Sequence, residues 1–283
     1  MAVVWDGRVR SCPRGVPGVS RGVGKGSRVG TRGKEGNGKE GACRLRIGSW
    51  NIGTLTGKSI ELSKILQKRK VNIACVQETR WAGTKVRNAD GYKLWYSGVV
   101  RGKNGVGILV DRDLRESVVK EGFDEIVRSI PPTERLFIGG NFNGYIGAAA
   151  GSYGEVHGGF GLGDRNGGGT SLLDFAKAFE LGIANSTFPK REEHLVTFRS
   201  LAVRTQIDYL LLRRCDRGLC KDCKVIPGET LATQHRLLVT DIDIMMKRKK
   251  RAKRMPEEWR LSTVVPLYKN KDDIQCCNVL EDG

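Results

Sequence analysis

The sequence lacks any long apolar run. No segment approaches the roughly 18 consecutive apolar residues of a membrane-spanning helix, and the N-terminal residues lack the apolar centre of a secretory signal peptide. We therefore expect an intracellular protein with no membrane partner. The eight cysteines are too scattered for the disulfide framework of a secreted domain. A zinc site from Cys215, Cys220, Cys223 and His235 is disfavoured, because the first pair is oddly spaced.

Acidic residues are few relative to basic ones. The chain has 31 Asp and Glu against 49 Lys and Arg, a formal charge of +18. Basic residues are concentrated at residues 1–42 and above all at residues 247–254, where seven of eight are Lys or Arg. This balance favours a polyanionic partner, nucleic acid before membrane surfaces. The alternative is that the tails only aid solubility. A nuclear location is expected if residues 247–254 act as an import signal.

Composition divides the chain into four parts. Residues 1–42 contain eleven glycines and almost no periodic apolar pattern, which predicts a disordered basic arm. Residues 43–246 are expected to form one folded domain, because this length can bury a substantial core. The basic run 247–254 and a C-terminal segment, residues 255–283, follow it.

Residues 46–81 predict a strand, a helix and a second strand. The first apolar run ends at Asn51, and the second, residues 71–76, leads into Glu78. Between them apolar residues recur at helical spacing, with Ser59 as the expected N-cap. Because a βαβ crossover makes its two strands parallel, Asn51 and Glu78 should open into one crevice.

The rest of the domain alternates between strand and helix patterns, which indicates the α/β class. A long Gly-rich loop at residues 144–169 is expected to be functional or disordered. Further strands are expected at 92–96, 105–110, 195–198, 206–212 and 236–244, and residues 136–144 repeat the pattern of an apolar run that ends in polar groups. Helices are expected at 124–130 and from Thr170 or Ser171 to Gly182.

Five polar residues follow or begin apolar runs far apart in the chain. A carboxylate suits a hard cation, amides can orient a phosphate or a water molecule, and an Asp can hold a His in one tautomer. Taken singly, each residue is as well explained by a surface or core position. The five are Asn51, Glu78, Asn143, Asp208 and His235.

Short sequence motifs around these residues resemble those of a known family. SWNIGTL, CVQETRW, GGNFNG, TFRS followed by TQIDYLLL, and QHRLL stand in the order seen in the endonuclease/exonuclease/phosphatase superfamily. The stretch 44–244 is similar to the version in LINE-type retrotransposons and in plant proteins labelled craniofacial development protein 2-like. The resemblance implies a DNase I-like four-layer α/β/β/α sandwich. Residues 257–273 resemble the opening segment of the reverse transcriptase of such elements, without its catalytic carboxylates.

The resemblance also implies roles for single residues. Glu78 would bind Mg²⁺, or Mn²⁺, with support from Asn51, and Asn143 would orient the attacking water or the phosphate. His235, held by Asp208, would stabilise charge on the phosphoryl oxygens. The implied reaction is metal-assisted hydrolysis of a phosphodiester in DNA by a monomer. Thr197 and Phe198 match the position that packs near the scissile nucleotide.

Three departures from the family pattern lead us to expect impaired activity or a non-catalytic nucleic-acid-binding remnant. The family motif GDFN reads GNFN here, so Asn141 replaces the Asp at the catalytic position. In addition, Gln234 replaces another carboxylate of the family motif. The third departure is a gap near residues 111–124, where the segment is too short to hold the strands of about 5 residues each that relatives have there. We expect an incomplete sandwich with exposed sheet edges.

Overall fold

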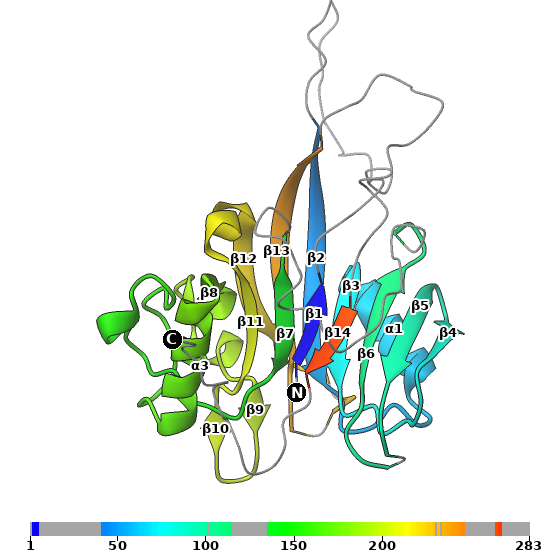
Figure 1. Cartoon of the computed structure of the whole chain (residues 1–283). Coiled ribbons are helices and arrows are strands. Elements are labelled where there is room, and N and C mark those ends of the chain that lie inside the picture. The colour runs from blue at the N-terminus through cyan, green and yellow to red at the C-terminus, as the bar shows by residue number, and fades with distance from the viewer. Residues whose placement is uncertain are drawn as a thin grey trace, which may run out of the picture.

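Two β-sheets stack face to face, and each carries an α-helix on its outer face (Figure 1). The computed structural model describes residues 2–5, 41–100, 102–114, 135–229, 231–232, 234–246 and 264–267. The order of layers is helix, sheet, sheet, helix, as expected for a DNase I-like sandwich. Within the described ranges, no helix has the length and hydropathy needed to cross a membrane.

The seven-stranded sheet contains the predicted strand, helix and strand unit. β2 and β3 pair in parallel, with Asn51 beside Gln77, and helix α1 (Ser59–Lys68) connects them, which confirms this prediction. The N-cap is Lys58, however, and Ser59 is already helical. In spatial order the strands are β12 (Cys220–Ile226), β13 (Leu237–Met246), β2 (Gly41–Asn51), β3 (Ile73–Gln77), β6 (Val106–Asp111), β5 (Tyr92–Ser97) and β4 (Lys85–Ala89).

The five-stranded sheet packs against the first through its inner face. Its strands in spatial order are β14 (Val264–Leu267), β1 (Ala2–Trp5), β7 (Phe137–Asn141), β11 (Asp208–Arg213) and β8 (Leu181–Ile183). Helix α3 (Gly167–Ala178) covers its outer face. The helix begins earlier than expected, because Asn166 is the N-cap and its side-chain oxygen accepts the N–H of Gly169. It also ends before Gly182, which belongs to β8.

Three apolar clusters fill the spaces between the layers. The central cluster lies between the sheets and joins Ile47 and Ile108 to Phe137 and Leu210. A second cluster packs α1 against the seven-stranded sheet, and a third packs α3 against the five-stranded sheet. Both sheets therefore share one core layer, which fixes how their edges align.

The edge of β7 is not left open. β1 pairs antiparallel with β7, and β14 pairs with the other side of β1, so segments from near both ends of the sequence lie side by side (Figure 1). The sequence patterns predict neither strand, and they predict exposed sheet edges without placing them at a particular strand. The rest of the predicted arm, the predicted helix at 124–130 and most of the predicted gap lie outside the described residues.

The connections carry short elements of their own. The Gly-rich loop 144–169 holds the 3₁₀ turn η2 (Gly151–Tyr153), and β9 (Phe198–Arg199) forms a hairpin with β10 (Arg204–Thr205). The expected strand at 195–198 begins only at Phe198, because the 3₁₀ turn η4 (Glu192–His194) precedes it. The remaining 3₁₀ turns are η3 (Ala184–Ser186) and η5 (Arg214–Leu219).

Candidate active site

Asn51 and Glu78 meet at the end of the parallel strand pair. Asn51 is the last residue of β2, and Glu78 follows the last residue of β3. The Asn51 Nδ2 donates to Glu78 Oε1 at 3.0 Å, while the Asn51 Oδ1 accepts the N–H of Gly53 at 3.1 Å. The amide therefore orients the carboxylate, as expected from the parallel pairing.

The two sheets approach closely just beneath this pair. A Cβ on Gly139 would lie 3.1 Å from Ser49, so a larger residue in β7 would push the sheets apart. The buried Gln77 side chain lies at the same junction, where its Nε2 donates to Ser49 Oγ at 3.2 Å. Since Gly139 stands two residues before Asn141, and Gln77 one before Glu78, polar groups from both sheets reach the same end of the sandwich.

Asn141 and Asp208 of the five-stranded sheet form a hydrogen-bonded line with His235, which lies just before β13 of the seven-stranded sheet. Asp208 lies opposite Asn141 in the pairing of β11 with β7. The Asp208 Oδ2 accepts from His235 Nδ1 at 2.9 Å, which assigns the proton to Nδ1 because a carboxylate only accepts. The second ring nitrogen, Nε2, then faces the Asn141 Nδ2 at 3.5 Å. This is the arrangement in which a carboxylate fixes the tautomer of an imidazole.

The carboxylate and the imidazole of this line differ in burial. The Asp208 side chain is 2% exposed and that of His235 is 14% exposed. The Trp50 indole N–H donates to the His235 carbonyl at 3.1 Å, which anchors the histidine backbone to β2. A buried carboxylate therefore holds an imidazole that is partly exposed.

Asn143 and Glu78 have strained backbones. Their φ angles are 52° and 56°, in the left-handed region that non-glycine residues seldom adopt. The Asn143 N–H donates to Asn141 Oδ1 at 3.0 Å, which holds the turn after β7. Such conformations are concentrated at functional sites, where the surrounding structure imposes them.

Thr197 and Phe198 lie next to Asp208 and His235 but have different roles. The Thr197 side chain is fully buried, and its Oγ1 accepts the backbone N–H groups of Ile207 and Asp208 at 2.9 and 3.0 Å. It therefore positions Asp208 and does not face solvent. Phe198 is half-buried and meets the His235 ring edge-on, with 5.0 Å between ring centroids.

A comparison with protein families decides the assignment. The profile described as the Endonuclease/Exonuclease/phosphatase family matches residues 48–226, which include Asn51, Glu78, Asn141 and Asp208. The chain belongs to this family.

Similar proteins agree with the family assignment and with the fold. Craniofacial development protein 2 from Tragulus javanicus and from Bos taurus are each 24% identical over 246 residues, covering 71% of this chain and 42% and 41% of theirs. The chain thus spans about two fifths of their length. An AP endonuclease from Archaeoglobus fulgidus superposes with a TM-score of 0.51 at 16% identity, over 71% of this chain and all of that one. This likeness confirms the DNase I-like fold. The endonuclease domain of TRAS1, a telomere-specific non-LTR retrotransposon, has a TM-score of 0.46 at 15% identity, covering 70% of this chain and 98% of that chain.

This member of the endonuclease/exonuclease/phosphatase family has few acidic groups at its site. In the part of the chain that the structure describes, no three His, Cys, Asp or Glu residues gather as a metal-binding group. Asn141 is an amide, and Gln234 is exposed and contributes its carbonyl to the N–H of Arg199 at 2.8 Å. Glu78 is thus the carboxylate that Asn51 orients at this end of the sandwich.

Sequence reasoning misses two residues that shape this site. The Arg80 guanidinium lies 3.7 Å from Glu78 Oε2, and Arg80 also has a left-handed backbone. Trp50 anchors His235, although their separation in sequence is 185 residues. The motif QETR places a cation two residues after the carboxylate and could have indicated Arg80. Nothing in the sequence pairs Trp50 with His235.

Proposed function

We propose that this chain is a retrotransposon-derived, metal-dependent DNA endonuclease domain with impaired activity. The observation that carries the proposal is the line from Asn141 through His235 to Asp208, formed at the end of the sandwich where Asn51 orients Glu78. Family membership supports phosphoester hydrolysis, and the LINE-type motifs together with the charge of +18 favour DNA as the substrate.

The residues of the line suit hydrolysis of a phosphodiester. With Asp208 on Nδ1, the Nε2 of His235 lies on the side of Asn141, and its protonated form would donate a hydrogen bond to a phosphoryl oxygen placed there. Asp208 stabilises that cation because it is buried and ionisable. Water adds to phosphorus, the bond to the leaving oxygen breaks, and the preorganised donor offsets the charge that develops on the other oxygens.

The donor set fits a magnesium ion held mainly by its substrate. Mg²⁺ in enzymes is typically bound by one or two carboxylates, several water molecules and substrate phosphates. Glu78 supplies one carboxylate, and Asn51 holds it in place. When bound, the ion would neutralise charge on the phosphate. Arg80 competes for the same carboxylate, so we expect weak affinity in the absence of DNA.

Asn141 is the main reason to expect impairment. Its Oδ1 is used by the Asn143 N–H, and its Nδ2 faces His235, where an aspartate would present a second oxygen. An amide cannot accept a proton at neutral pH, and loss of a general base typically costs about 10²- to 10⁴-fold in rate. The replacement leaves the geometry of the turn intact while it removes the proton acceptor.

The test is plasmid nicking by the full chain with Mg²⁺, comparing the wild type with Asn141→Asp. We expect Asn141→Asp to raise the nicking rate by at least about 100-fold. Asn88→Asp is the matched control, since it adds the same charge at an exposed position of β4 and should change nothing. Adding His235→Ala or Glu78→Gln to Asn141→Asp should abolish the gain. Absence of nicking by Asn141→Asp would reject the catalytic proposal.

Metal dependence has a readout apart from activity. Paramagnetic Mn²⁺ bound to the protein can be measured by electron paramagnetic resonance, with and without a short DNA duplex. We expect Mn²⁺ binding that tightens with DNA and is weakened by Glu78→Gln. Equal Mn²⁺ binding by the wild type and Glu78→Gln would remove Glu78 from the metal site.

The second candidate is a non-catalytic nucleic-acid-binding remnant. It is favoured by Asn141 and by the absence of a multi-carboxylate group among the described residues. It predicts DNA binding that weakens steeply with salt, as phosphate contacts do, with no nicking even by Asn141→Asp. A gain of nicking by that variant rejects this candidate.

A further inference from the structure

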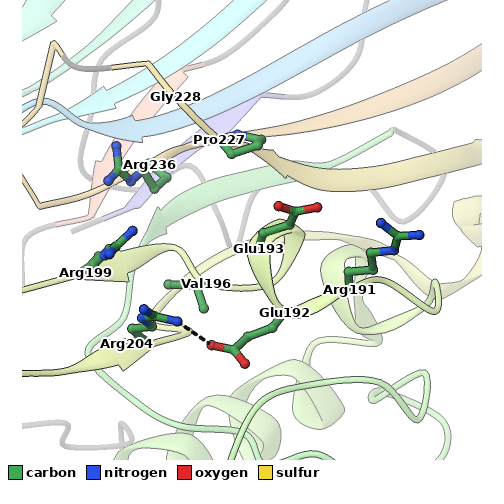
Figure 2. A pocket seen from close by; sticks show the side chains of 9 residues that line it. All are labelled: Arg191, Glu192, Glu193, Val196, Arg199, Arg204, Pro227, Gly228 and Arg236. Atoms are coloured by element: carbon green, nitrogen blue, oxygen red, sulfur yellow. Dashed lines mark ion pairs between the residues drawn. The ribbon is translucent and has the colours of Figure 1, made fainter.

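A positively charged hollow lies on the far side of the β9–β10 hairpin from His235. It has a volume of about 480 Å³ and is lined by Arg191, Glu192, Glu193, Val196, Arg199, Arg204, Pro227, Gly228 and Arg236. Figure 2 shows Arg199, Arg204 and Arg236 on one side of the hollow and Arg191 on the other, beyond Glu193. None of these arginines belongs to the catalytic line.

Strand register explains why three arginines share one face. Arg199 lies directly opposite Arg204 in the hairpin, and the isolated bridge between Phe198 and His235 extends the ladder to a third segment. Side chains alternate between the faces of a ladder. Phe198 and His235 therefore lie on the face toward Asp208, while Arg199 and Arg236, the next residue in each segment, face the hollow.

The charge on this face is only partly balanced by the protein. Arg204 pairs with Glu192 at 3.5 Å, and Arg236 Nη1 donates to the Glu229 carbonyl at 3.3 Å. Glu193 lies 3.7 Å from the His194 ring. No described side chain forms an ion pair with Arg199. Like charges directly opposite in a ladder destabilise it, so an anion bound between Arg199 and Arg204 would stabilise the hairpin.

We propose that this arginine hollow binds a backbone phosphate of the DNA duplex whose scissile phosphodiester is held at His235. The proposal rests on DNA being the substrate. Because the register places Arg199 and Arg236 on the opposite face of the ladder from His235, the bound phosphate would lie outside the catalytic site, further along the DNA. The planar guanidinium groups that line the hollow suit phosphate oxygens.

The test measures binding of a fluorescent 20-base-pair duplex to the full chain in EDTA, by anisotropy over a range of salt concentrations. We expect Arg199→Gln to weaken binding by roughly tenfold, the effect of one lost charged contact. It should also reduce the slope of log K against log salt by about 1. Arg112→Gln is the matched control, because Arg112 is exposed just beyond β6, at the opposite end of the sheet from Glu78.

The variant Glu192→Gln is expected to bind DNA more tightly, a result that a misfolded protein would not give. It releases Arg204 and removes a negative charge from the hollow, so binding should tighten severalfold. The proposal is overturned if Arg199→Gln behaves like Arg112→Gln, if Glu192→Gln does not tighten binding, or if the wild type does not bind the duplex. Duplex binding that depends on Arg199, without nicking by Asn141→Asp, would refute the endonuclease function while leaving the hollow in place.

Discussion

The two sheets differ in how far they keep the family pattern. The seven-stranded sheet takes all its strands from residues 41–246 and carries Asn51 and Glu78. The five-stranded sheet takes β1 and β14 from regions near the ends of the chain and carries Asn141 where the family motif has a carboxylate. The difference teaches that the packing of the two sheets and the polar residues at their ends can change separately, because the shared core depends on apolar side chains while Asn141 lies at the end of β7.

The largest expected effect tests whether the sheets are one cooperative unit. Leu109 packs under α1 and Leu211 packs under α3, and both are fully buried. Truncation to Ala should cost about 2–5 kcal/mol of unfolding free energy in each case. Because the central cluster joins the sheets, chemical denaturation should remain a single transition in both variants. A separate early transition in Leu211→Ala would show that the five-stranded sheet unfolds alone.

A smaller effect tests whether β1 contributes to the five-stranded sheet. β1 has a paired strand on each side, so Val4→Pro removes a ladder hydrogen bond from an interior strand. We expect a loss of about 1–3 kcal/mol, the usual cost of an unsatisfied buried backbone group. Val4→Ala is the control, since it keeps the backbone N–H. Equal melting temperatures for these two variants would mean that β1 adds no stability.

The smallest effect is a dependence on pH that arises beside the five-stranded sheet. His157 is buried in the Gly-rich loop, where its Nδ1 accepts the Gly159 N–H at 2.9 Å and its Nε2 lies 3.1 Å from the Gly147 carbonyl. Burial lowers the pKa of His157 below its usual 6.5. As pH falls, the unfolded chain therefore takes up the proton first. The free energy of unfolding that the neutral His157 contributes is complete above pH 6.5 and is lost as pH falls below that value.

The slope from this histidine should not exceed about 1.4 kcal/mol per pH unit. Unfolding by urea at pH 7.5, 6.5 and 5.5 measures it, with His157→Gln as the control that should flatten the profile. Asp111, at the end of β6 in the other sheet, has a pKa raised by burial. Its contribution has the opposite sign, because it favours the folded state as pH falls. An unchanged slope in His157→Gln would assign the effect to other groups.

Much of the seven-stranded sheet follows from local patterns. The apolar runs before Asn51 and Glu78, with helical spacing between them, predict β2, α1 and β3 correctly. β4 is missed because four of its five side chains are exposed, which leaves no apolar alternation to detect. The start of α3 is missed because Asn166 precedes three glycines, so its capping role depends on the turn that brings its oxygen to the Gly169 N–H.

The sequence by itself determined the family, the α/β class and the polar residues that stand at strand ends, because strand and helix periodicities and short motifs are local properties of a chain. Only the tertiary structure decided which of these residues meet. Asp208 and His235 are 27 residues apart, Asn141 and His235 are 94 apart, and the face shared by Arg199, Arg204 and Arg236 depends on register. Such contacts follow from how the two sheets stack and pair, and a shift of one residue in register would turn each side chain to the opposite face.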